Sequence, residues 1–105
     1  MKEYSVYITP AALEDMESIY NYISVELQSV YNASKQYDRI SDAILTLDSM
    51  PERCPLFDNE PEYTMGIRRL IVDNYLVCYI IQDEQVTVTN VLYGASDVHA
   101  ILSGE

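Results

Sequence analysis

The stretch GIRRLIVDNYLVCYII, residues 66–81, contains two apolar runs separated by the polar pair Asp73-Asn74. A two-residue break of this kind joins the strands of a tight hairpin, and Asn tolerates the positive φ that such turns need. A third apolar run begins after a second two-residue break, Asp83-Glu84. The sequence therefore predicts an antiparallel meander with strands at residues 67–72, 75–82 and 85–93.

The sequence before this meander predicts a strand and a pair of helices. Residues 4–9 alternate between apolar and polar side chains, which is typical of a strand. Thr9 and Pro10 suit a helix start, because Thr accepts a bond from a free N–H and Pro has no N–H to leave unpaired. Ser29 is a candidate cap for a second helix, and Pro51 ends it. The predicted apolar stripes comprise Leu13, Met16, Tyr20, Ile23 and Leu27 in the first helix and Ala33, Tyr37, Ile40, Ile44 and Leu47 in the second.

These elements define an α+β fold in a single domain, residues 1–105. The order is an N-terminal strand, an antiparallel helix hairpin forced by the short link, a Pro-rich loop at residues 51–66, and the meander. A short C-terminal helical turn, capped by Ser96 or Asp97, is expected to run through Leu102. A chain of this length buries enough surface to fold without disulfides or metal, and we expect no metal or cofactor.

The middle strand of the meander is apolar on both faces. Two helices cover only one face of a small sheet, so the other face needs a different cover. Either residues 51–66 and the C-terminal tail fold over it, or a partner chain does. The ten tyrosines of the chain favour the partner slightly, because a tyrosine ring tolerates a half-buried surface. One face presents Tyr75, Val77, Tyr79 and Ile81, and the other presents Leu76, Cys78 and Ile80.

The charge balance of the chain argues against nucleic acid as a partner. Six basic and seventeen acidic residues give a formal net charge of −11, which cannot supply a broad basic footprint for phosphates. The sequence has no secretory segment and no run of membrane-spanning length. Cys54 and Cys78 are expected to be reduced thiols in a cytoplasmic protein, and His99 a surface residue.

Four motifs occur in order over about residues 4–102. They are TPAALEDM at residues 9–16 with Ile19, Tyr22 and Ile23; Asn32-Ala33 with Ile40, Ala43, Ile44, Leu47, Pro51 and Arg53; Gly66-Ile67-Arg68 ahead of Tyr75 and Tyr79; and VLYGASD at residues 91–97. In this order and at this spacing, they resemble the RelE/ParE superfamily of bacterial type II toxins.

The resemblance implies a toxin made beside an antitoxin whose C-terminal segment wraps and neutralises it. Members similar to RelE cut messenger RNA with a cluster of basic residues near the last strand, whereas members similar to ParE poison DNA gyrase. Here Ala95 and Ser96 stand where that cluster often has cations, and Tyr93 stands where many members have His. The sequence therefore favours a ParE-like, non-enzymatic toxin.

Two other functions stay open at this stage. A RelE-like ribonuclease would use Arg68 and Tyr93, and an inactive toxin-derived binding module would keep only the antitoxin contact. Arg68 also has a structural interpretation, as a partner for carboxylates on the helix hairpin. The candidate partner-binding residues are Arg68, Arg69, Tyr75, Tyr79 and Tyr93.

The acidity of the chain also leads to an expectation about the antitoxin. Its wrapping segment should carry more Lys and Arg than usual, or should rely chiefly on apolar contacts. Both a homodimer and a toxin–antitoxin hetero-oligomer are compatible with the sequence.

Overall fold

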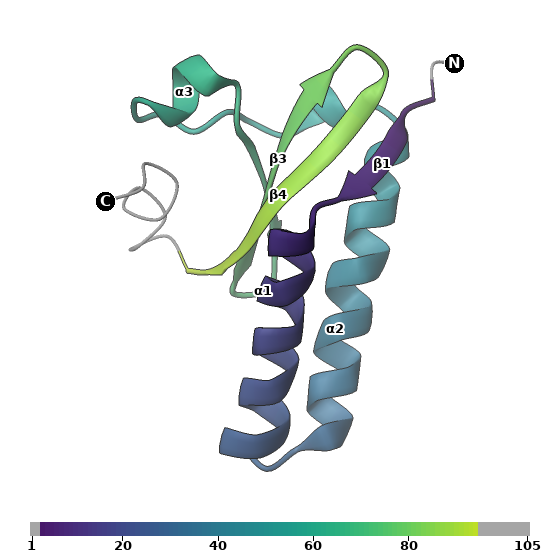
Figure 1. The fold of residues 1–105 in the computed structure, drawn as a ribbon, viewed down its shortest axis with the longest axis vertical. Coiled ribbons are helices and arrows are strands. Elements are labelled where there is room, and N and C mark those ends of the chain that lie inside the picture. The colour runs from purple at the N-terminus through teal and green to yellow at the C-terminus, as the bar shows by residue number, and fades with distance from the viewer. Residues whose placement is uncertain (1–2, 95–105) are drawn as a thin grey trace.

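The computed structural model describes residues 3–94 and has the expected α+β fold (Figure 1). The predicted C-terminal helical turn lies outside the described residues. The four strands fall within one residue of their predicted bounds. Both helices begin where predicted, but the first ends at Asn21, short of Leu27, and the second ends at Leu45, short of Pro51. The main elements are β1 (Ser5–Ile8), α1 (Pro10–Asn21), α2 (Val30–Leu45), β2 (Arg68–Val72), β3 (Tyr75–Gln82) and β4 (Gln85–Tyr93).

The four strands form one sheet in the order β1-β4-β3-β2. β2, β3 and β4 are the predicted antiparallel meander, while β1 runs parallel to β4 and lies at the edge. Both hairpins turn over two residues, and the positive φ falls on the first of each pair, Asp73 (56°) and Asp83 (55°). The sequence argument placed the positive φ on Asn74, which is wrong.

Both predicted helix caps are present. Thr9 Oγ1 accepts from the Ala12 N–H at 3.2 Å and donates to the Val88 carbonyl at 2.9 Å, so the start of α1 is fixed to β4. Ser29 Oγ accepts from the Asn32 N–H at 3.2 Å at the start of α2. These bonds satisfy backbone donors that a helix leaves free at its first turn.

The apolar stripe of the first helix differs from the predicted one. Ala12 and Met16 are buried, whereas Leu13 is 41% exposed and Leu27 is 58% exposed. After Asn21 the chain forms a π-helical turn, Tyr22–Glu26, in which the Leu27 N–H donates to the Tyr22 carbonyl five residues back. The wider turn shifts the helical phase, so Leu27 leaves the stripe that Ile23 ends. In the second helix the predicted stripe is confirmed, with Tyr37 as its half-buried member.

The main core lies between the helix hairpin and one face of the sheet. Met16 of α1 and Ile40 and Ile44 of α2 pack there with Val77 and Tyr79 of β3. α1 and α2 run side by side and extend well beyond the end of the sheet (Figure 1). The outer part of the hairpin therefore has no sheet to pack against.

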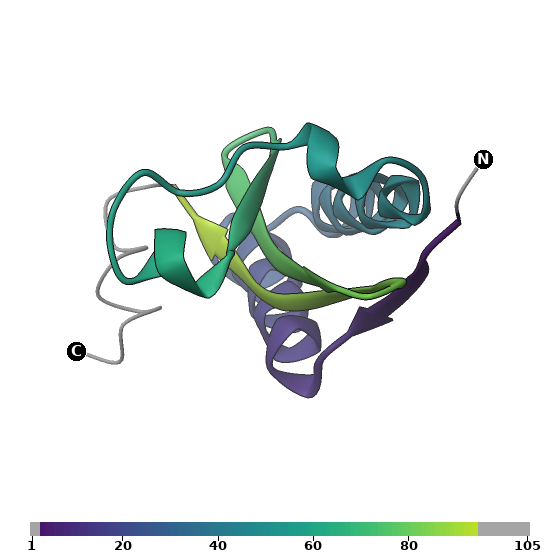
Figure 2. The same cartoon turned by 90° about the horizontal axis from the view of Figure 1, so that it is seen from above.

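The second face of the sheet is covered by the protein's own chain. The connector, residues 51–66, contains a 3₁₀ turn (Pro51–Arg53) and leads into α3 (Glu62–Met65). Backbone bonds tie it to β2 and the residue before it, from Phe57 N–H to the Ile67 carbonyl and from Arg69 N–H to the Pro55 carbonyl, both 3.1 Å. α3 and α2 lie on opposite sides of the strands (Figure 2). Phe57 of the connector and Ile80 of β3 pack on a buried cluster of Ile67, Leu76, Cys78 and Leu92.

The sequence left two possible covers for this face, the protein's own chain or a partner chain. In the structure the connector covers it. A partner chain is not needed there, except near the β2–β3 turn, where Ile71 stays 67% exposed. The surface available to a partner has to be sought elsewhere.

Candidate protein-binding groove

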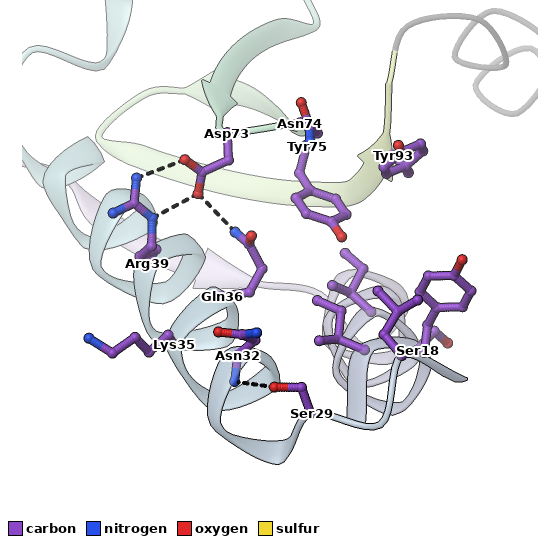
Figure 3. Close-up of a pocket in the computed structure, with 14 residues that line it drawn as sticks. Ser18, Ser29, Asn32, Lys35, Gln36, Arg39, Asp73, Asn74, Tyr75 and Tyr93 are labelled. Carbon is purple, nitrogen blue, oxygen red and sulfur yellow. Dashed lines mark hydrogen bonds and ion pairs between the residues drawn. The ribbon is translucent and has the colours of Figure 1, made fainter. Parts of the chain in front are cut away.

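A groove of about 930 Å³ lies between the helix hairpin and the β2–β3 turn (Figure 3). One wall comes from the end of α1 and the π turn, the other from α2, and the turn with the end of β4 closes the top. Its apolar lining consists of Ile19, Tyr22, Ile23, Leu27, Tyr75 and Tyr93.

The groove follows from two features of the fold. The helices extend past the end of the sheet, so no strand lies over their outer turns (Figure 1). The π turn begins at Tyr22, which is 56% exposed, and it takes Leu27, 58% exposed, out of the helix stripe. Concave, largely apolar sites with a few polar groups are typical of ligand and peptide binding.

An aromatic pair marks the sheet side of the groove. Tyr75 of β3 and Tyr93 of β4 are register partners, with ring centroids 5.4 Å apart in an edge-on arrangement. Tyr75 is buried and Tyr93 is 69% exposed. Burial, followed by the nearby Tyr93, raises the pKa of Tyr75.

The opposite edge of the groove is polar. Arg39 of α2 makes a two-pronged ion pair with Asp73, through Nε–Oδ2 and Nη2–Oδ1 contacts of 2.7 Å each, and Gln36 adds a bond of 3.0 Å to Asp73. The bond from Arg39 is the main reason that the pKa of Asp73 is lowered. Lys35 lies over the Tyr31 ring with its Nζ 5.1 Å from the centroid. This edge joins α2 to the β2–β3 turn and sets the width of the groove.

The structure ties both candidate arginines to the connector. Arg68 Nη1 donates to the carbonyls of Cys54 at 2.6 Å and Glu52 at 3.1 Å, so it bonds to backbone oxygens and not to helix carboxylates. Arg69 points to the other face, where its guanidinium lies 5.4 Å from the Phe57 ring centroid. Both side chains hold the connector against the sheet.

Tyr79 is not a surface residue, which corrects its assignment to a partner-binding surface. Its side chain is fully buried, and its hydroxyl donates to the Pro51 carbonyl at 2.6 Å. Burial also raises the pKa of this phenol. The alternation of the strand placed Tyr79 beside Tyr75 and Val77 correctly, but the start of the connector closes over it.

Arg68 and Tyr93 do not come together as a ribonuclease pair. Arg68 is the register partner of Tyr79, and Tyr93 is the register partner of Tyr75. The two positions are thus four residues apart along β3, about 13 Å, and lie on the strands to either side of it. No group of three or more His, Cys, Asp or Glu residues that could hold a metal occurs in the part of the chain described.

Sequence reasoning identified Tyr75 and Tyr93 but missed most of the groove. Lys35 and Arg39 lie four residues apart on α2. They are exposed, and they also line the groove. No sequence signal showed that Asp73, a turn residue, would meet Arg39. The ten tyrosines of the chain pointed to a half-buried aromatic surface, and Tyr22 was noted only as part of a family motif.

The structure is thus a small α+β domain with an open, largely apolar groove beside its helix hairpin. The sequence profile of the family described as "ParE toxin of type II toxin-antitoxin system, parDE" matches residues 6–98, and the chain belongs to this family. No curated protein matches the sequence. Across residues 3–94, no helix has the length and apolar character needed to cross a membrane.

Solved structures share the fold. A chain of the chromosomal ParDE toxin–antitoxin system from P. aeruginosa has a TM-score of 0.74 at 18% identity, with 89% of this chain and 98% of that one covered. A chain of the RelBE2 toxin–antitoxin complex from Mycobacterium tuberculosis has a TM-score of 0.65 at 17% identity, with 87% and 98% covered.

Proposed function

We propose that this protein is a ParE-like toxin that arrests growth by binding a protein target such as DNA gyrase, and that a cognate antitoxin neutralises it. Membership of the ParE toxin family supports the toxin role. The groove between the helix hairpin and the β2–β3 turn is the observation that carries the antitoxin site. Within residues 3–94 it is a large concave and mostly apolar surface that the connector leaves open.

A mechanism of binding, without RNA cleavage, fits the placement of the cations. Cleaving RNA requires cations that hold the phosphate and stabilise its extra charge in the transition state. Arg68 instead donates to two connector carbonyls, and Tyr93 belongs to the groove. The protein therefore acts by occupying a surface of its target.

The charges of the groove define the antitoxin segment that would fit. The charged side chains that line it are Lys35, Arg39 and Asp73, one more cation than anion, in a chain of net charge −11. A segment lying in the groove would be apolar, with a carboxylate opposite Lys35. The parts of the antitoxin that continue over the acidic remainder of the toxin would carry Lys and Arg.

The proposal is tested by expression in bacteria, alone and with the product of the neighbouring gene. We expect growth arrest that the second protein relieves, and inhibition of purified gyrase in a supercoiling assay. Leu27→Asp places a charge in the groove and should weaken antitoxin binding about tenfold or more. Leu45→Asp is the matched control, because Leu45 is equally exposed (59%) and lies outside the groove.

Two outcomes would contradict this function in different ways. Ribosome-dependent cleavage of messenger RNA that Arg68→Ala abolishes would make the protein a RelE-like ribonuclease. Folded, fully expressed protein that binds the antitoxin but leaves growth unchanged would make it a binding module without toxicity.

A further inference from the structure

The outer end of the helix hairpin exposes a second apolar surface. We define the hairpin tip as residues 22–31, which include the π turn, the link and the start of α2. Of the thirteen large apolar side chains exposed in the described part of the chain, five lie in these ten residues. They are Tyr22 (56%), Val25 (67%), Leu27 (58%), Val30 (62%) and Tyr31 (68%).

The surroundings of the tip are electrically neutral. Residues 18–37 contain one acid, Glu26, and one base, Lys35, whereas the whole chain has a net charge of −11. Two copies of such an acidic chain repel each other over most of their surfaces. At the tip this repulsion is reduced, because the charges of residues 18–37 cancel, and five exposed apolar side chains lie within ten residues.

The local structure suits a two-fold contact. Glu26 ends the π turn on the α1 side, and Lys35 lies on α2 against Tyr31; no ion pair joins the two within residues 3–94. In a symmetric pair, each surface meets its own copy, so an acid on one helix can face a base on the other. Two hairpin tips packed in this way would bury the apolar side chains that each tip leaves exposed.

We propose that a second copy of this chain docks on the hairpin tip, with Val25, Val30 and Tyr31 in the contact and Glu26 of each copy facing Lys35 of the other. This goes beyond the proposed toxin function and does not depend on it. Tyr22 and Leu27 belong to both the tip and the groove, so the dimer covers one end of the groove.

The test is the mass of the full chain in solution, measured by sedimentation equilibrium at concentrations up to about 1 mM. We expect the mass to rise from 12.0 kDa to twice that value as concentration increases. Added salt screens both the repulsion between the two acidic copies and the attraction of the Glu26–Lys35 pairs, so the mass is measured at low and at high salt. A monomer throughout this range, at both low and high salt, would overturn the proposal.

Variants locate the contact. Tyr31→Glu should raise the dissociation constant about tenfold or more, whereas Leu45→Glu, at an equally exposed site on the same helix, should leave it unchanged. Glu26→Lys and Lys35→Glu should each weaken the dimer, and the double exchange should restore it. A dimer that Tyr31→Glu leaves intact, or a double exchange no tighter than the single ones, would place the contact elsewhere.

Discussion

The second face of the sheet and the free side of the helix hairpin are both apolar in sequence, but only one of them is closed. The connector covers the sheet face and brings its own aromatic ring, Phe57, into contact with Ile80 and the buried cluster. The hairpin side has no such segment, and Tyr22, Leu27 and Tyr93 stay more than half exposed. Apolar character alone therefore does not identify a binding surface in this protein.

The difference lies in what anchors a covering segment. The connector is held by backbone bonds to β2, by Arg68 and by the Tyr79 hydroxyl, which together satisfy the carbonyls of Pro51, Glu52, Cys54 and Pro55. A loop can cover a sheet only when its polar backbone groups find such partners. On the hairpin side, the ends of the groove are formed by side chains, and no described segment crosses it.

The largest effect on stability is expected from removing a buried side chain on the sheet face that the connector covers. Ile67→Ala removes a side chain that is 3% exposed, and we expect it to lower the free energy of unfolding by about 2–5 kcal/mol. Ile71→Ala is the matched control four residues further along the same segment, in β2. Ile71 is 67% exposed, so this substitution should cost less than about 0.5 kcal/mol. Urea denaturation measures both. Equal costs would mean that the connector does not close this face.

The second-largest effect is expected from losing the hydrogen bond between the Tyr79 hydroxyl of β3 and the Pro51 carbonyl of the connector. Tyr79→Phe leaves the buried Pro51 carbonyl without its donor, so we expect a loss of about 1–3 kcal/mol in the free energy of unfolding. Tyr93→Phe removes an exposed hydroxyl at the groove and should change it by less than about 0.5 kcal/mol. Similar losses of unfolding free energy for the two variants would show that the Tyr79 hydroxyl does not anchor the connector more strongly than the Tyr93 hydroxyl supports the groove.

The smallest effect should come from the polar edge of the groove. The pKa of Asp73 is lowered from its usual 3.8, chiefly by Arg39, so its contribution to stability is present above pH 3.8 and is lost as the pH falls through the lowered value. The small difference in unfolding free energy between wild type and Asp73→Asn should therefore disappear on acidification.

Asp83→Asn is the matched control for this pH dependence. Asp83 also begins a two-residue turn with positive φ, but it makes no ion pair within residues 3–94. A pH-dependent difference of the same size for Asp83→Asn would assign the effect to the turn residue itself and not to the contact with Arg39.

Sequence patterns predicted the elements well because the signals are local. Thr9 and Ser29 cap the helices as expected, and the two-residue breaks form the hairpins. The stripe of the first helix was misjudged because the size of Leu13 suggested burial, while the small Ala12 fits against the sheet. The π turn that exposes Leu27 also has no recognised pattern in the sequence.

The candidate site was predicted less well because it joins segments far apart in the chain. Tyr75 and Tyr93 were found from their strands, but the Arg39–Asp73 contact spans 34 residues. Arg68 and Arg69 were assigned to a partner because their charge stands out in an acidic chain. Their bonds to connector carbonyls depend on a loop path that the sequence does not specify.

The sequence by itself determined the order of the elements, the hairpin of helices, the meander and the family, because caps, turns and apolar periodicity act over a few residues. Tertiary structure alone decided that β1 pairs with β4, that the connector covers the second face and that the helices extend past the sheet. Those outcomes depend on which surfaces meet between segments far apart in the chain. The groove stays open because no segment within residues 3–94 covers that part of the apolar surface.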